Sequence, residues 1–260
     1  NRFSIVLTAN KLLVFLAQQN DDLFIESQIY AYSILKQYDK VFLFLENYMG
    51  RLFKERQYSA FLEFVDFALE GENSNLNANS KLQLAIAGLT AWTIKREINS
   101  PGAKPLFTIA KKLLMGTSGT DSLYYKMCYD YFCAEALFNN CDFKQSLILS
   151  KPYYDKCMAH ELFHTDGEWQ EKICITYALS VKELEGNEKA QEIFIHLYHI
   201  FPDSFFIQIE YWDHQQCMNF FSNPKYALEC VKKVLFLFEK TSRQDYPLPF
   251  HEYVDRAMCA

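Results

Sequence analysis

Residues 166 to 202 constrain the fold of this chain most strongly, because two helix-length apolar patterns meet there at a short turn. The first pattern is formed by Cys174, Tyr177, Ala178 and Val181, and the second by Ala190, Phe194, Leu197 and Tyr198. Both follow one face of an α-helix with about 3.6 residues per turn. Gly186 and Asn187 separate the patterns, and Pro202 ends the second because proline lacks a backbone N–H. The segment therefore predicts a helical hairpin.

The composition favours an all-α fold. Half of the 260 residues are hydrophobic, which is enough to form a sizeable core. Only 8 Gly and 7 Pro are present, so the chain lacks the regular turn residues that punctuate β-sandwiches and barrels. The 23 Phe and 17 Tyr are expected mostly between helices, although a curved array leaves some of them to line a groove.

Helical spacing of apolar residues recurs along nearly the whole chain. We expect helices over 3–17, 23–35, 41–52, 58–69, 82–98, 106–115 and 121–138, from 143 with Pro152 as a kink or break, from 205 after a Ser204 cap, and over 226–238. The buried stripe of the 121–138 helix is expected at Leu123, Met127, Tyr131, Ala134 and Leu137. We expect loops at 71–80, 99–105 and 116–121, and a short last helix at 251–258.

Charge and hydropathy exclude two classes of partner. The net charge is −6, and the densest basic pairs, Lys111-Lys112 and Lys232-Lys233, form no stripe for a phosphate backbone, so direct nucleic-acid binding is not expected. No apolar run approaches the roughly 20 residues that span a bilayer, so no membrane partner is expected. The sequence starts at Asn1 directly with an amphipathic pattern, and we hypothesise that it is a fragment whose partners include other domains of a longer chain.

The eight cysteines are better explained as free thiols than as a disulfide framework. None of them forms a C-x-x-C pair, and Cys133, Cys174 and Cys230 occupy apolar positions of helical patterns, where a thiol behaves as a small hydrophobic group. A reducing compartment, cytoplasmic or nuclear, is therefore the expected setting.

The second helices of the predicted hairpins share an anchor pattern. A small or apolar residue is followed four and seven residues later by two more, at Ala190, Phe194 and Leu197, at Ala227, Val231 and Val234, at Phe61, Val65 and Ala68, and at Val41, Leu45 and Tyr48. This pattern resembles the tetratricopeptide repeat (TPR), a helix-turn-helix unit of about 34 residues. The match is best at Gly186, Ala190, Phe194 and Pro202. The resemblance is degenerate: the turn at 186–189 is one residue short, the Trp-to-Leu-Gly pattern is missing from every first helix, and Ser146 precedes Ala190 by 44 residues.

The resemblance implies one right-handed α-α superhelix over residues 1–260, with a sub-boundary near 99–105. It further implies a scaffold or sensor domain that binds a protein or peptide on its concave face and has no catalysis of its own. The candidate partner-binding residues lie on the first helices, off the packing stripe: Tyr124, Tyr125, Tyr129, Lys172 and Tyr211. Packing between hairpins is the alternative role for each of them. An irregular helical bundle, or a PCI-, HEAT- or armadillo-like solenoid, is the alternative fold.

One motif points to a different chemistry. His160, Glu161 and His164 form an H-E-x-x-H sequence, which on a helix could bind zinc through the two histidines with Glu161 as general base. Gly167 continues the metzincin pattern, but Gln170 stands where the third histidine belongs. A zinc metalloprotease is thus the alternative function. A helix end followed by a new cap explains the same residues structurally.

No cofactor is predicted. The segment 116–121 lacks the Lys-Ser or Lys-Thr of a phosphate loop, and dinucleotide and serine-hydrolase fingerprints are missing from the sequence. His196 and His199 are spaced so that they could meet a metal, but such a pair more often lies on a solvated helix face. The aromatic interior could also hold a small apolar ligand, which no spacing predicts.

Overall fold

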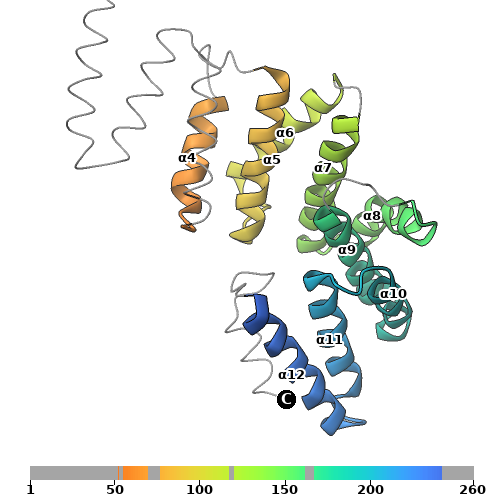
Figure 1. Cartoon of the computed structure of the whole chain (residues 1–260). Helices are drawn as coiled ribbons and strands as arrows, with labels where there is room; N and C mark the ends of the chain where they lie inside the picture. Colours follow the sequence, from red (N-terminus) through yellow and green to blue (C-terminus); the bar gives the residue numbers. More distant parts are fainter. Residues whose placement is uncertain (1–51, 53–54, 70–76, 117–119, 162–166, 242–260) are drawn as a thin grey trace, which may run out of the picture. The chain divides into compact units, whose positions relative to one another are not determined.

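The computed structural model describes residues 52, 55–69, 77–116, 120–161 and 167–241. The described residues form nine α-helices and one short 3₁₀ helix and contain no β-strand, so the predicted all-α class is confirmed (Figure 1). None of the described helices is both long and apolar enough to cross a membrane. The helices predicted at 3–17, 23–35 and 251–258, and nearly all of 41–52, lie outside the described residues.

The chain divides into two compact units, Asn1–Lys95 with Pro105–Gly116, and Arg96–Lys104 with Thr117–Ala260. In the first unit the helices are α4 (Tyr58–Leu69), α5 (Ala78–Ile94) and nearly all of α6 (Lys104–Leu114). Helix α4 packs on α5, and Gly88 of α5 allows close approach of Leu106 from α6 and Val65 from α4. Leu82 and Leu89 complete this core and are fully buried.

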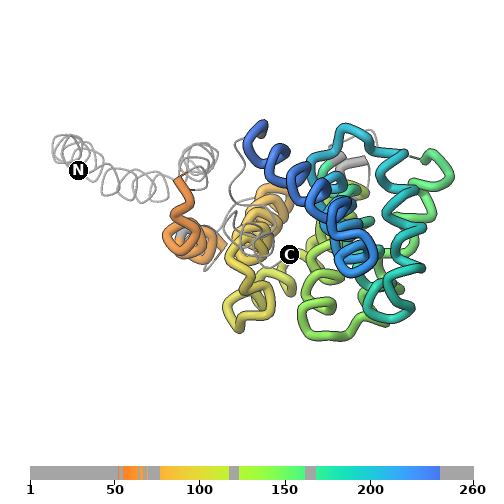
Figure 2. Tube along the Cα trace, turned by 90° about the horizontal axis from the view of Figure 1, so that it is seen from below, coloured from red at the N-terminus to blue at the C-terminus, as the bar shows by residue number. Residues whose placement is uncertain are grey.

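The second unit contains three consecutive helical hairpins. Its helices are α7 (Thr120–Asn139), α8 (Phe143–Met158), α9 (Gly167–Glu185), α10 (Asn187–Ile200), α11 (Phe205–Asn219) and α12 (Pro224–Thr241), and η1 (Pro101–Ala103) precedes them. Helices α7 and α8, α9 and α10, and α11 and α12 pack as pairs, and α9 also contacts α7, α8 and α11. Figure 2 shows the trace of these helices from below, with consecutive helices next to one another as the contacts indicate.

The hairpin predicted over 166–202 is confirmed as α9 and α10. The turn between them is a single glycine, Gly186, with φ 95° and ψ 173°, a conformation that only glycine adopts without strain. All of the predicted anchors are buried except Tyr198, which is half-buried. Hydrophobic burial on both sides of one left-handed residue therefore fixes this hairpin.

Local side-chain hydrogen bonds decide several helix ends. The Ser204 hydroxyl accepts a hydrogen bond from the Ile207 amide at 3.2 Å, which confirms the predicted cap of α11. The loop prediction for 71–80 is wrong at its end, because α5 begins at Ala78 once the Asn77 side chain accepts from the Ser80 amide at 2.8 Å. Helix α5 also ends before 98, at Ile94, two residues ahead of Arg96 with φ 60°. Pro152 does not divide the return helix: α8 runs through it to Met158.

Candidate functional site

The first helices of the three hairpins lie next to one another, because α9 contacts both α7 and α11. All five residues predicted to bind a partner lie on these helices: Tyr124, Tyr125 and Tyr129 on α7, Lys172 on α9 and Tyr211 on α11. The neighbours of each side chain determine whether it is available to a ligand.

Lys172 is held by contacts within the chain. Its Nζ lies 2.5 Å from the Glu168 carboxylate and 4.7 Å from the ring centroids of both Trp169 and Phe206. The side chain is only 15 % exposed. A cation between two aromatic faces and beside a carboxylate is already compensated, and through the Phe206 ring Lys172 joins α9 to α11.

A half-buried carboxylate lies close to this lysine. Burial raises the pKa of Glu135 on α7, and hydrogen bonds to Asn139 and Thr176, together with the charge of Lys172, oppose that rise. The Thr176 hydroxyl donates to Glu135 Oε2 at 3.4 Å. The Glu135 carboxylate is therefore a polar contact between α7 and α9, and it lies half-buried between these helices.

The predicted tyrosines also pack against neighbours. Tyr211 stacks on Tyr198 of α10 with ring centroids 4.5 Å apart, and it lies edge-on to Trp212 at 4.7 Å. Tyr124 and Tyr125 form an edge-to-face pair at 5.3 Å. Tyr129 is half-buried, and burial followed by the nearby Cys133 raises its pKa. All five predicted residues are thus half-buried, and each contacts another side chain of the same chain.

The H-E-x-x-H sequence lies at a helix end. Helix α8 stops at Met158, and His160 has φ 57°, so His160 is not part of a continuing helix. His160 and Glu161 are exposed, while His164 lies outside the described residues. No group of three or more His, Cys, Asp or Glu side chains within the described ranges is arranged to hold a metal ion.

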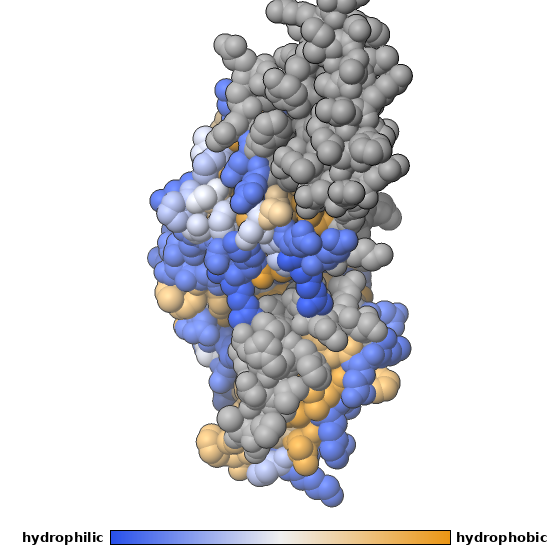
Figure 3. Space-filling model, turned by 90° about the vertical axis from the view of Figure 1, so that its left-hand side faces the viewer, coloured by the Kyte–Doolittle hydropathy of each residue, from blue (hydrophilic) through white to orange (hydrophobic). Residues whose placement is uncertain are grey.

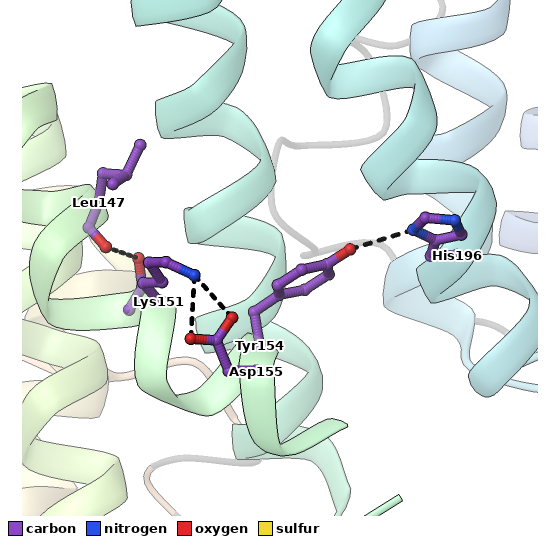
Figure 4. Close-up of polar contacts among 6 residues, drawn as sticks. Leu147, Lys151, Tyr154, Asp155 and His196 are labelled. Atoms are coloured by element: carbon purple, nitrogen blue, oxygen red, sulfur yellow. Dashed lines mark hydrogen bonds and ion pairs between the residues drawn. The ribbon is translucent and has the colours of Figure 1, made fainter. Parts of the chain in front are cut away.

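His196, the other histidine considered for a metal, contacts a tyrosine. The Tyr154 side chain of α8 points toward α10, and its hydroxyl lies 3.1 Å from His196 Nδ1 (Figure 4). Tyr154 also stacks on Tyr177 of α9 at 4.7 Å, and on α8 the Lys151 ammonium pairs with Asp155 at 2.7 Å. These contacts join α8, α9 and α10 and give His196 a structural neighbour.

An open groove that the sequence did not predict lies where α10 ends and α11 packs on α12. Its volume is about 430 Å³, and its lining residues are Tyr198, Asp203, Phe205, Gln208, Trp212, Lys233, Phe236, Leu237 and Lys240. Phe205, Trp212 and Leu237 form the floor, because they pack on a buried core of Ile209, Val234 and Phe238. Apolar and hydrophilic side chains lie side by side in the lower part of Figure 3, which α11 and α12 occupy.

Lysine side chains line one side of this groove. Lys233 Nζ lies 3.5 Å from the centroid of the Trp212 ring, and Lys240 is exposed two turns further along α12. Within the described part of the chain, no carboxylate lies within ion-pair distance of either lysine. Asp203 is the one acidic residue among the lining residues that the structure describes. Among the described residues, the groove therefore combines an aromatic floor with two lysines that have no ion-pair partner there.

The sequence carried only fragments of this site. The sequence shows the Lys232-Lys233 pair and Trp212. The groove, however, forms only where α11 and α12 pack together, and the spacing of residues along the chain does not predict that packing. Comparisons with protein-family models, curated proteins and solved structures found no match to the chain.

Proposed function

We propose that this chain is a binding module without catalysis of its own, and that it captures a short acidic peptide segment with apolar side chains in the groove between α11 and α12. The observation that carries the proposal is the lining itself: exposed aromatic surface beside Lys233 and Lys240, neither of which has an ion-pair partner in the described residues. Phe236 is 60 % exposed and lines the groove together with the aromatic rings of Phe205 and Trp212, so the apolar surface there is continuous rather than a single side chain.

The chemistry of the lining selects the class of ligand. A leucine or phenylalanine of the peptide would lie against Phe205 and Trp212, and a neighbouring carboxylate would meet Lys240 or the ammonium above Trp212. Asp203 on the other side disfavours a segment that is acidic throughout and favours one with acidic residues at one end. The groove is open rather than enclosed, which suits a peptide better than a small molecule that must be surrounded.

The hairpin arrangement supports the same role. Three consecutive hairpins whose first helices contact one another are the arrangement expected of a tetratricopeptide-like array. In such an array each hairpin leans on the next, and ligands bind to the exposed surface that the row creates. We infer that the chain serves as a scaffold or sensor domain of a larger regulatory protein or assembly.

Fluorescence anisotropy with a labelled peptide tests the proposal. The probe is fluorescein-Gly-Lys-Leu-Gly-Phe-Asp-Leu-Glu-Gly, and the matched probe has Lys in place of Asp and Glu. We expect the acidic probe to bind with Kd of roughly 10 to 100 µM, weakening as salt is added, and the basic probe to bind at least tenfold more weakly. Equal binding of both probes, or binding of neither, would overturn the proposal.

Charge reversal locates the binding to the groove. Lys240→Glu should weaken the acidic probe about fivefold, since one exposed attraction of up to about 1 kcal/mol is lost and replaced by repulsion. Lys225→Glu is the matched control, because Lys225 is an exposed lysine at the start of the same helix and does not line the groove. Phe236→Ala should also weaken the probe, with little effect on folding because the ring is largely exposed. A loss of the same size in the Lys225 variant would place the binding elsewhere.

A further inference from the structure

The α8–α9 contact contains two thiols side by side. Cys157 Sγ lies 3.4 Å from Cys174 Sγ, and both residues are fully buried. The Gln170 amide nitrogen donates a hydrogen bond to Cys157 Sγ at 3.0 Å. Cys157 is the last residue but one of α8, and Cys174 lies in the second turn of α9. Two sulfurs in van der Waals contact need to move only a little over 1 Å to reach a bond length of about 2.05 Å.

From this geometry we propose that Cys157 and Cys174 are a modification site, at which peroxide converts the two thiols into a reversible disulfide between α8 and α9. The described cysteines are all free thiols in the structure, which is thus the reduced form.

The two thiols have different roles in the reaction. Hydrogen bonds from the Cys174 thiol and the Gln170 amide lower the pKa of Cys157, whereas burial raises the pKa of Cys174. Cys157 therefore loses its proton first, and its thiolate attacks one oxygen of hydrogen peroxide. The O–O bond breaks, hydroxide leaves and takes up the released proton as water, and Cys157 becomes a sulfenic acid.

Cys174 completes the disulfide. Its sulfur attacks Cys157 Sγ, the S–S bond forms as the S–O bond breaks, and the sulfenic oxygen leaves as water with the Cys174 proton. In total, two thiols lose two electrons and two protons, and one hydrogen peroxide is reduced to two waters. The short sulfur–sulfur distance favours this second step over further oxidation of Cys157.

The burial of Cys157 limits the rate at which peroxide oxidises its thiol. Cys157 lies in the last turn of α8, where it packs against Gln170 and Cys174 of α9, and the residues that follow it, Met158, His160 and Glu161, are exposed. Fraying of a helix end is a low-energy local opening, so peroxide reaches Cys157 without unfolding of the unit. We expect the reaction to be slower than the oxidation of the exposed thiols Cys141 and Cys217.

Tryptic mapping reads the product directly, because cleavage after Lys156, Lys172 and Lys182 puts the two cysteines on separate peptides, 157–172 and 173–182, with one cysteine each. The whole chain is treated with hydrogen peroxide, the remaining thiols are alkylated, and the digest is analysed without reduction. We expect the two peptides linked at a mass two hydrogens below their sum, and separated by dithiothreitol. Unlinked peptides, or Cys157 carried to the sulfinic acid, would overturn the proposal.

A stability measurement supplies the second readout. Closing this loop, whose two cysteines are 17 residues apart, should raise the melting temperature by about 5 to 10 °C. Cys174→Ala should abolish both the linked peptide and the peroxide-induced rise, whereas Cys230→Ala, which removes a buried thiol of α12, should keep both. If Cys174→Ala fails to fold, the presence or absence of the linked peptide in the unsubstituted chain still tests whether the disulfide forms. A rise that persists in folded Cys174→Ala protein would contradict the assignment.

Discussion

The imidazole of His214 lies against the ring of Phe194, with ring centroids 4.9 Å apart and the rings tilted by 35°. His214 Nε2–H donates to the carbonyl oxygen of Asn187 at 3.2 Å, but Nδ1 is buried and has no hydrogen-bond partner among the residues that the structure describes. Burial, helped by the charge of Lys182, lowers the pKa of His214 from its ordinary 6.5 to about 4. The second unit therefore carries a neutral histidine between α10 and α11.

This histidine makes stability depend on pH. Between pH 6.5 and 4 the unfolded chain binds a proton at His214 that the folded chain does not, so stability is complete above about pH 6.5 and is lost as pH falls toward 4. We expect the free energy of unfolding to fall by about 1 to 2 kcal/mol over this range, since partial access of water reduces the full electrostatic effect. Urea unfolding at pH 7, 5.5 and 4 measures it.

Two variants isolate the contribution of His214. His214→Phe removes the titrating group and should flatten that part of the pH profile, while carboxylates still contribute at the acid end. His199→Gln is the control, because His199 is an exposed histidine near the end of α10, away from the contact between His214 and Phe194. An unchanged slope in His214→Phe would show that the slope comes from other groups.

Local signals in the sequence predicted the hairpins well. The turn at Gly186 and the cap at Ser204 depend on one residue and its immediate neighbours, so the pattern specifies them. The apolar stripes gave the buried faces of α9, α10 and α12 for the same reason. Leu123 is an exception: it fits the stripe of α7 but is 55 % exposed, because helical spacing shows a face and not how far a neighbouring helix covers it.

The candidate site was much less predictable. Lys172 and Tyr211 were expected to face a ligand because they lie off the packing stripes, yet each contacts an aromatic ring of a neighbouring helix. The groove brings Phe205 and Leu237 together from two helices, and their crossing depends on packing across more than thirty residues of sequence. The spacing of apolar residues along one helix does not predict which residues of another helix it will contact.

Replacement of the turn glycine should destabilise the second unit. Gly186→Ala places a Cβ on a residue with φ 95° and ψ 173°, and although no heavy atom lies within 4 Å of that Cβ, the backbone conformation itself is strained for alanine. We expect a loss of about 1 to 2 kcal/mol in the free energy of unfolding, measured by urea titration. Gly116→Ala, which meets only the Leu113 oxygen at 3.7 Å, should be close to neutral. Equal effects of the two substitutions would contradict this account.

A buried hydroxyl joins α7 to α8. Tyr153 Oη donates to Asp130 Oδ2 at 2.6 Å, and the same carboxylate accepts from the Lys126 ammonium at 2.5 Å. Tyr153→Phe should cost about 1.5 to 3 kcal/mol, because it removes a hydrogen bond to a buried charged group. Lys126→Met should cost less than about 1 kcal/mol, since the lysine is 58 % exposed. Thermal or urea unfolding of both variants shows which substitution lowers the free energy of unfolding more. A larger loss in Lys126→Met than in Tyr153→Phe would show that the ammonium contributes more than the hydroxyl to this contact.

In the first unit, α5 carries a glycine for reasons of space rather than of backbone conformation. A Cβ at Gly88 would lie 2.6 Å from Leu106 Cδ1 and 3.1 Å from Val65 Cγ1, and both of those residues are fully buried. Alanine at position 88 requires only a shift of the Leu106 side chain. The free-energy cost of that shift is partly offset because alanine has a higher helix propensity than glycine, by about 1 kcal/mol. Valine adds two more methyl groups to a filled core.

We therefore expect Gly88→Val to lower the free energy of unfolding by about 2 to 3 kcal/mol and Gly88→Ala by less than about 1 kcal/mol. Urea unfolding followed by the fluorescence of Trp92, which lies in α5 beside this contact, measures both. The double variant Gly88→Val with Leu106→Ala removes the side chain that the new methyl groups meet, so it should be more stable than the sum of the two single losses predicts. Additive losses would mean that Leu106 is not the group that excludes a larger residue at position 88.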